Sequence, residues 1–188
     1  ESKNIYLESF DISQIELFSS LGSAVPLVPS SHSIANQYLV GELRERSSGS
    51  LFEIGVGRAV QLVAFLRMLA ADPGSLRTLK VLALDPDTSN LAVTTAAVEA
   101  LRAQLPFELV LETRAGLLEH VSDEHLRAWA EFLGPEPVVN SSFTLHHVMH
   151  PVNDLEFRTR LLKRIREYFN PSVFTLIEPH ADHDTEGF

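Results

Sequence analysis

Residues 51–58 read Leu51-Phe52-Glu53-Ile54-Gly55-Val56-Gly57-Arg58, an apolar run that ends in two closely spaced glycines. The run is typical of a buried strand, and the segment from Ala59 to Ala71 has the apolar spacing of a helix. Gly55 and Gly57 permit positive φ angles and let a ligand approach the backbone between these two elements. The first N–H groups of the helix would then face that ligand. The alternative is a tight turn that binds nothing, because Val60 replaces the third glycine of a dinucleotide fingerprint.

A second apolar run, residues 80–85, ends in a carboxylate, Asp85. Nucleotide-binding βαβ units place at this distance the acid that accepts both hydroxyls of a ribose. A carboxylate suits that task because its two oxygens can each accept a donor. Asp85 could instead cap the next helix, although Pro86-Asp87-Thr88 already supplies capping residues. The sequence therefore favours ribose binding by Asp85.

Composition limits the classes of protein to which the chain can belong. The 188 residues are 45% hydrophobic and 21% charged, which fits one globular domain with a sizeable core. The net charge of −10, without a basic stripe, argues against nucleic-acid and anionic-membrane partners. There is no cysteine, so disulfides and cysteine-based zinc sites are excluded. With no signal peptide or spanning segment in the sequence, we expect a cytoplasmic protein.

From Leu51 onward, apolar runs alternate with helical patterns. Strands are expected at about 51–55, 79–84, 107–113, 137–142 and 172–177, and helices at about 58–71, 88–104, 117–132 and 154–169. The strands are apolar on both faces, which is typical of a parallel sheet covered by helices on each side. The predicted fold class is α/β, a doubly wound, Rossmann-like, mostly parallel sheet with an N-terminal helical segment.

We divide the chain into an N-terminal helical arm or cap, residues 1–47, and a core, residues 48–188. An amphipathic helix is expected from Asp11 to Ser20, followed by a connecting arm at Val25–Pro29 that cannot be a helix interior.

Ser31 or Ser33 is expected to cap a second helix that runs through Arg46. Its inward residues are expected to be Ile34, Tyr38 and Leu39.

Sheets of this class bind ligands beyond the carboxyl ends of their strands. Most residues suited to chemistry follow those ends. They are Gly55 and Gly57 after the first strand, Asp85 and Asp87 after the second, Arg114 to Gly116 after the third, Asn140 to His147 at the fourth, and Glu178 to His183 at the fifth. The fourth and fifth strands are expected to be neighbours, which would bring these residues to one site.

These features resemble class I S-adenosylmethionine-dependent methyltransferases and, more closely, the GRAS family. The matching pieces are Ala35-Asn36-Gln37, residues 76–81, Val139-Asn140, Arg158 with Leu161-Leu162 and Ile165-Arg166, the run 170–178 (Asn-Pro-Ser-Val-Phe-Thr-Leu-Ile-Glu), Ala181-Asp182-His183 and Phe188. The resemblance covers most of residues 33–188.

The resemblance implies a methyltransferase-like fold. Plant members of the family are transcriptional regulators that usually lack a glycine-rich cofactor loop, whereas bacterial members resemble working small-molecule methyltransferases. This chain keeps Glu53, Gly55, Gly57 and Asp85, which favours the bacterial, cofactor-binding type. It departs from the methyltransferase pattern at Arg58 and Ala59, where a third glycine is common.

The resemblance also implies roles for a cofactor site that holds S-adenosylmethionine. Glu53 would bind the methionine end, the backbone of Gly55 and Gly57 would pass beneath the cofactor, and Asp85 would hold the ribose. The remaining expected contacts are Asp87 or the residues around Arg114 and Ala115 at the adenine, and Asn140 near the amino group.

Methyl transfer to oxygen or nitrogen often needs a base that removes a proton from the acceptor. The candidates are His146, His147, Glu178, His180 and His183. Histidine titrates near neutral pH, but each candidate could equally be a structural or loop residue. His146, His150, His180 and His183 with Glu178 or Asp182 could instead ligate a metal. The sequence has no recognised zinc motif, and no metal is expected.

The leading hypothesis is a methyltransferase-like enzyme whose partner is a small-molecule methyl acceptor, with a homodimer as a possible assembly. The alternatives are a non-catalytic GRAS interaction module that binds a protein or small ligand, and a nicotinamide-dependent oxidoreductase. The family also has an antiparallel hairpin after the fifth strand, and this sequence stops at Phe188, before that hairpin. We expect a partner chain or the N-terminal arm to cover the resulting open edge.

Overall fold

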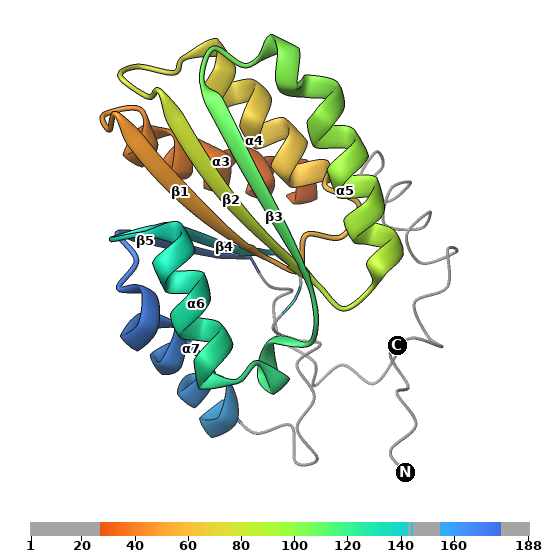
Figure 1. Cartoon of the computed structure of the whole chain (residues 1–188), viewed down its shortest axis with the longest axis vertical. Coiled ribbons are helices and arrows are strands. Elements are labelled where there is room, and N and C mark those ends of the chain that lie inside the picture. The colour runs from red at the N-terminus through yellow and green to blue at the C-terminus, as the bar shows by residue number, and fades with distance from the viewer. Residues whose placement is uncertain (1–26, 143, 145–154, 178–188) are drawn as a thin grey trace.

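The computed structural model describes residues 27–142, residue 144 and residues 155–177, and Figure 1 shows their arrangement. Its elements, including two short 3₁₀ helices labelled η, follow one another along the chain. They are α3 (Leu27–Leu43), β1 (Ser48–Ile54), α4 (Val60–Ala71), β2 (Thr78–Asp85), α5 (Thr88–Leu101), η1 (Arg102–Gln104), β3 (Glu108–Ala115), η2 (Leu118–His120), α6 (Asp123–Leu133), β4 (Val138–Ser142), α7 (Leu155–Phe169) and β5 (Val173–Ile177).

The described strands form one parallel sheet in the order β3-β2-β1-β4-β5. β1 is central, and the order reverses between β1 and β4, which is where sheets of this class bind ligands. The register sets Glu53 of β1 beside Ala83 of β2 on one side and Asn140 of β4 on the other. β4 and β5 are neighbours, so the expected α/β fold class and this strand pairing are confirmed.

Helices cover both faces of the sheet, with α3, α4 and α5 on one face and α6 and α7 on the other (Figure 1). Side chains alternate along β1, so Leu51 enters the core under α4, and Phe52 enters the core under α6 and α7. The two faces therefore have separate cores. The residues expected in the core of α4 pack there, with Leu62, Phe65, Leu66 and Leu69 buried and Val63 partly buried.

The helix before β1 differs from the expectation in its length and in the face it buries. It begins at Leu27 and ends at Leu43, rather than running from Ser31 or Ser33 through Arg46. The expected arm at Val25–Pro29 therefore overlaps its first turn, where proline is tolerated because the first N–H groups have no helical partner.

The expected inward residues of α3 are only partly correct. Leu39 is buried, but the exposed fractions of Ile34 and Tyr38 are 55% and 67%, so both point outward. The buried side of the helix includes Ala35 and Asn36 instead. Asn36 is polar, so hydrophobicity alone assigned the wrong face.

The helix expected at 117–132 is divided into η2 and α6. Ser122 separates them as the N-cap of α6, with its hydroxyl accepting a hydrogen bond from the N–H of His125. The helix expected at 88–104 is likewise α5 followed by η1. Both differences arise at helix ends, where a tighter 3₁₀ turn often replaces the α-helix.

Several expectations fall on residues that the structure does not describe. The helix expected at 11–20 lies outside the described residues, and the expected cover over the outer edge of β5 and the division at residue 47 stay predictions. None of the described helices is long and apolar enough to cross a membrane.

Candidate functional site

The glycine turn joins the end of β1 to the start of α4. The N–H groups of Gly55 and Val56 both donate to the carbonyl oxygen of Leu84, at 2.8 and 3.1 Å, which fixes the turn against β2. Gly55 and Gly57 have φ angles of 72° and 52°, in the left-handed region that favours glycine. The expected strand–turn–helix unit is therefore present.

The two glycines have different surroundings. A Cβ atom on Gly55 would collide with the side chain of Thr144, whose hydroxyl lies 3.2 Å from the carbonyl oxygen of Ile54. A Cβ atom on Gly57 would meet no atom of the described residues within 4 Å. The approach to the turn is therefore closed over Gly55 by Thr144 and open over Gly57.

Ala59 adopts a glycine-like conformation at the place where methyltransferases commonly have a third glycine. Its φ angle is 61°, and it forms the N-cap of α4 without a side-chain hydrogen bond. Its methyl group is fully buried in the core under α4. The third position of the turn thus adopts a conformation that favours glycine although its residue is alanine.

The Asp85 carboxylate is buried at the end of β2 and joins β2 to the glycine turn. Oδ2 accepts the N–H of Gly57 at 2.8 Å, and Oδ1 accepts the N–H of Asp87 at 2.9 Å and Nδ2 of Asn90 at 3.2 Å. Burial raises the pKa of Asp85, and the hydrogen bonds from Asp87, Gly57 and Asn90 oppose that rise. Thr94 of α5 donates to the carbonyl oxygen of Gly57 at 3.3 Å, so Gly57 is held at both its N–H and its carbonyl.

Asp87, rather than Asp85, is the N-cap of α5. Its Oδ1 accepts the N–H of Ser89 at 2.7 Å. The capping alternative considered for Asp85 is therefore wrong. The expected contacts of Asp85 with a ribose and of Asp87 with an adenine stay predictions.

Glu53 is the buried acid of β1, and its exposed fraction is 3%. Its Oε1 accepts Nδ2 of Asn140 at 2.6 Å. Burial raises the pKa of Glu53 to about 8, although the hydrogen bond from Asn140 lowers it. Within the part of the chain that the structure describes, no cationic side chain is paired with this carboxyl. Glu53 and Asn140, both expected near the methionine end of a cofactor, are thus in direct contact.

Asn140 belongs to a buried polar cluster between the sheet and helices α3 and α4. Asn140 Oδ1 accepts the hydroxyl of Thr175 at 2.7 Å and Nε2 of Gln61 at 3.4 Å. The same Nε2 lies 3.3 Å from Oδ1 of Asn36. We call Asn36, Glu53, Gln61, Asn140 and Thr175 the amide cluster.

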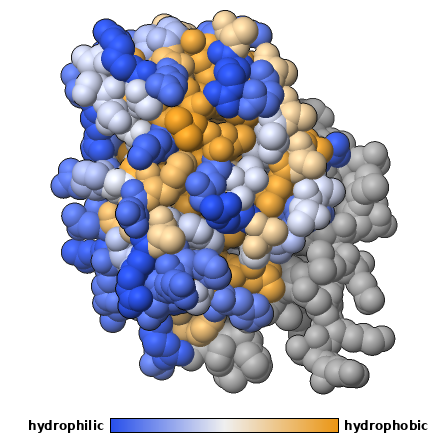
Figure 2. Space-filling view, viewed as in Figure 1, coloured by the Kyte–Doolittle hydropathy of each residue, from blue (hydrophilic) through white to orange (hydrophobic). Residues whose placement is uncertain are grey.

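Arg114 and Ala115 line a cavity of about 540 Å³ between the edge strand β3 and helix α6. Arg114 forms an ion pair with Glu112, and the aromatic side chains of Trp129 and Phe132 lie across from them. In Figure 2, apolar side chains are visible between hydrophilic ones on the side of the molecule where β3 runs in Figure 1. The cavity begins beside Asp85, since Ala115 pairs with Asp85 across the sheet.

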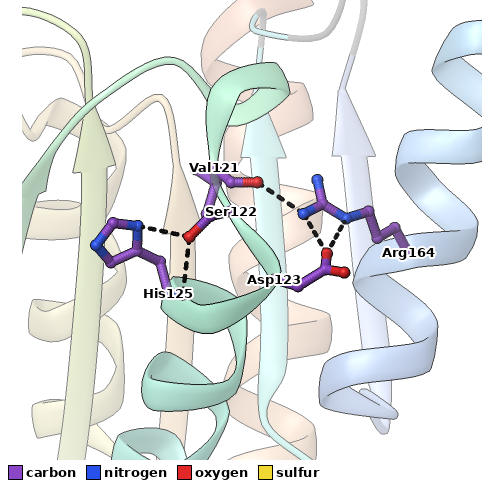
Figure 3. Close-up of polar contacts among 5 residues, drawn as sticks. All are labelled: Val121, Ser122, Asp123, His125 and Arg164. Atoms are coloured by element: carbon purple, nitrogen blue, oxygen red, sulfur yellow. Dashed lines mark hydrogen bonds and ion pairs between the residues drawn. The ribbon is translucent and has the colours of Figure 1, made fainter.

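Figure 3 shows the polar contacts at the start of α6, next to this cavity. The Ser122 hydroxyl lies 3.0 Å from Nδ1 of His125, and Asp123 accepts a hydrogen bond from Nε of Arg164 at 2.9 Å. Although a serine, a histidine and an aspartate are adjacent, Asp123 binds Arg164 of α7 and not His125. The arrangement is a helix cap and an ion pair, and it lacks the order of a nucleophilic triad.

The expected catalytic residues cannot be placed. They lie outside the described residues, as do the residues of the alternative metal set: His146, His147, His150, Glu178, His180, Asp182 and His183.

Sequence reasoning missed Asn36, Gln61, Asn90, Thr94, Thr144 and Thr175 as parts of the site. Gln61 carried a signal, because it is a polar residue on the buried face of the largely apolar helix α4, whereas the apolar residues of α3 indicated a face that does not include Asn36.

Comparison with solved structures identifies the fold. The small RNA methyltransferase HEN1 matches 79% of this chain and 16% of its own chain, with 15% identity and a TM-score of 0.56. This similarity supports the Rossmann-like fold of class I methyltransferases.

Two curated relatives come from Arabidopsis thaliana. Scarecrow-like protein 23 is 21% identical over 92% of this chain and 41% of its own length. Scarecrow-like transcription factor PAT1 is 25% identical over 82% of this chain and 32% of its own length. The chain thus spans about a third to two fifths of the length of these relatives.

The GRAS domain family model matches residues 3–188, nearly the whole chain. The match agrees with the resemblance noted in the Asn-Pro-x-Val-Phe segment and in Val139-Asn140. The chain belongs to the GRAS domain family.

Proposed function

We propose that this chain binds S-adenosylmethionine at the carboxyl ends of β1 and β2 and is a methyltransferase-like protein acting on a small molecule. The observation that supports this most is the pair of buried carboxyls, Glu53 and Asp85, on adjacent strands with the turn at Gly57 open between them. One acid suits an ammonium group, and the other suits the hydroxyls of a ribose.

Glu53 fits the ammonium end of such a ligand. A buried carboxyl without a cationic partner is costly to ionise, and its raised pKa reflects that cost. A ligand ammonium would supply the missing positive charge. Binding would therefore favour the ionised form of Glu53 and release a proton at neutral pH.

Asp85 can accept a ribose hydroxyl, but few acceptor positions of its carboxylate remain free. An ionised carboxylate offers about four acceptor positions, and three protein donors already contact Asp85. Oδ2 has one protein donor, Gly57, and can accept a ligand hydroxyl as well. The donors from Gly57 and Asn90 also hold the carboxylate in place before a ligand arrives.

When bound, S-adenosylmethionine supplies an activated methyl group. In this proposal the chain contributes orientation and charge: Glu53 and Asp85 hold the two ends of the ligand, and Gly57 permits close approach of the backbone. Removal of a proton from the acceptor is assigned to the group that includes His146, His147, Glu178 and His180.

The test compares two glycines that both have positive φ angles. Gly57 and Gly134 both have positive φ angles, 52° and 80°, and a Cβ on either would meet no atom of the described residues within 4 Å. Gly134 has a ψ angle of −167°, in a region that almost only glycine adopts, so Gly134→Ala should cost at least as much stability as Gly57→Ala. Only Gly57→Ala puts a methyl group where the ligand would pass.

Calorimetry with S-adenosylmethionine and S-adenosylhomocysteine measures the outcome. We expect binding by the unmodified protein and by Gly134→Ala, and at least about tenfold weaker binding by Gly57→Ala. No binding to a properly folded, full-length sample would refute the proposal. Equal weakening by both substitutions would show that backbone strain, rather than the ligand path, is responsible.

A second function, a non-catalytic interaction module, has its own support. Thr144 closes the approach over Gly55, and protein donors already occupy most of the Asp85 carboxylate. One relative is named as a transcription factor. Capture of a defined protein partner that is unaffected by Asp85→Ala, together with no binding of either adenosyl compound, would favour this function.

A further inference from the structure

We propose that Asn36 of α3 and Gln61 of α4 are positioning residues. They turn the Asn140 amide so that its N–H group, not its oxygen, faces Glu53, which keeps Glu53 an acceptor for a cationic ligand group. The effect on ligand binding rests on the proposed function above, whereas the orientation of the Asn140 amide is a property of the protein alone.

The orientation of Asn140 needs an explanation because its nearest partners do not determine it. A side-chain amide presents an oxygen on one side and an NH₂ group on the other, and a half-turn exchanges them. The Thr175 hydroxyl can donate or accept, so it can bond either end of the Asn140 amide. Gln61 is itself an amide and can also turn. Something further along the cluster must determine which atom faces which.

That fixed point is a backbone carbonyl, which can only accept. Nδ2 of Asn36 donates to the carbonyl oxygen of Gln61 at 3.5 Å, so Oδ1 of Asn36 must face the other way. Oδ1 is then an acceptor for Nε2 of Gln61, 3.3 Å away. Nε2 in turn lies 3.4 Å from Oδ1 of Asn140, which leaves Nδ2 of Asn140 to donate to Glu53 at 2.6 Å. Each amide orients the next one.

The hydrogen bonds of Gln61 indicate that its neighbours determine the orientation of its side-chain amide. Its Nε2 faces two acceptors, while its Oε1 is buried and has no hydrogen-bond partner among the described residues. An unpaired buried acceptor costs free energy. Turning the amide would instead place Oε1 against the oxygens of Asn36 and Asn140, which is worse because acceptors would then face acceptors.

The cluster therefore acts on Glu53 through one hydrogen bond. A donor at Oε1 favours the carboxylate and opposes the effect of burial, which raises the pKa of Glu53 to about 8. Few charged groups compete with this bond on the same face of the sheet. On β1, β4 and β5 Glu53 is the sole charged residue among those described.

The neighbouring elements contribute few titratable groups. Asp85 of β2 is bonded to Gly57, His32 of α3 has its pKa lowered by burial, and Arg67 of α4 is exposed. Glu42 of α3 pairs with Arg46 beyond the end of that helix, and Lys80 of β2 points to the opposite face, where it donates to the carbonyl oxygen of Phe132. The Asn140 amide is thus the main polar influence on Glu53.

The test measures the titration of Glu53 in the ligand-free, full-length protein. Carbon-13 labelling of glutamate carboxyls gives a signal for Glu53, assigned by its loss in Glu53→Gln. Asn36→Leu removes the link between the fixed carbonyl of Gln61 and the other amides while keeping the side-chain volume similar. We expect the pKa of Glu53 to rise by about 1 unit, because the Asn140 amide is then free to present its oxygen.

Thr175→Val is the matched control. It also removes one hydrogen bond from Asn140, at 2.7 Å, but leaves Asn36 and Gln61 in place. We expect a shift of less than about a third of that in Asn36→Leu. Asn36→Ala provides the same test if the leucine variant does not fold. Equal shifts in the asparagine and threonine variants, or no shift on changing Asn36, would overturn the proposal.

A ligand experiment separates this proposal from the proposed function. At pH 7, a rise of about 1 unit in the pKa of Glu53 lowers its ionised fraction, and S-adenosylhomocysteine should bind about tenfold more weakly to Asn36→Leu. The deficit should shrink as the pH rises toward 9. If the unmodified protein binds neither adenosyl compound, the proposed function fails, and the titration experiment still decides the role of Asn36.

Discussion

The two faces of the central strand differ in what they bury. Phe52 of β1 enters a core made of aromatic and aliphatic side chains, with ring centroids 5.9 Å from Trp129 and 5.1 Å from Phe169. The next residue, Glu53, enters the amide cluster on the opposite face. Adjacent residues of one strand thus have opposite effects on folding stability. Phe52 increases the stability of the protein, and Glu53 reduces that stability unless a cation is supplied.

The largest expected effect is on the apolar face. Phe52→Ala leaves a cavity between Trp129 and Phe169, and substitutions of this kind cost about 3–5 kcal/mol. Urea denaturation should show this loss at every pH from 5 to 8, since no titratable group is removed. Val110→Ala, at a residue of β3 that is 36% exposed, is the control and should change the free energy of unfolding by well under half as much.

The next effect is on the polar face and has the opposite sign. The folded pKa of Glu53, about 8, is above its unfolded value of 4.5, so the unfolded chain loses this proton first. Stability therefore falls as the pH rises from 4.5 to 8. Glu53→Gln removes this loss and should stabilise the ligand-free protein at pH 8 by on the order of 3 kcal/mol, with little change at pH 4.5. A pH-independent effect in urea denaturation would contradict the assignment.

A smaller effect is expected at the cap of α6, on the apolar side of the sheet (Figure 3). The Ser122 hydroxyl accepts the N–H of His125 at 3.2 Å. Ser122→Ala should cost about 1 kcal/mol of folding stability. Ser122→Asp should retain the cap and is the control. Comparable losses of stability in both variants would show that the loss does not come from the capping hydrogen bond.

The smallest effect is expected one residue further on. Hydrogen bonding from Arg164 lowers the pKa of Asp123, so the contribution of this pair is present above the unfolded pKa and is lost as the pH falls. The pair is exposed to solvent, so Asp123→Asn should matter less than Ser122→Ala and should have no effect in 1 M salt. Thermal denaturation at low and high salt tests this.

Much of the fold was predictable because strands buried on both faces and helices have distinct periodicities. The glycine turn, the acid at the end of β2 and the pairing of β4 with β5 follow from local sequence and from the rules for parallel sheets. Val81 and Leu82, for example, are both fully buried although they point to opposite faces. Apolar residues at adjacent positions of a strand therefore indicate a sheet covered on both faces, even when the neighbouring strands and helices are not known.

The rest depended on contacts between distant segments. Asn36 is buried because Gln61 of another helix is beside it, and this pairing turns Ile34 and Tyr38 of α3 toward solvent. Asp85 was expected to be available to a ribose, yet it also binds the backbone of the turn. The side chain of Thr144 blocks the approach to Gly55 and leaves the approach to Gly57 open. No residue pattern within one segment encodes these partners.

Ala59 has a consequence for how relatives of this protein are found. An alanine in the left-handed conformation costs roughly 1–2 kcal/mol, and burial of its methyl group under α4 offsets part of that cost. The surrounding core, not the identity of the residue, thus maintains the turn. Genome searches that demand glycine at this position would discard chains with the same backbone, and a search that accepts alanine next to a buried helix start would recover them.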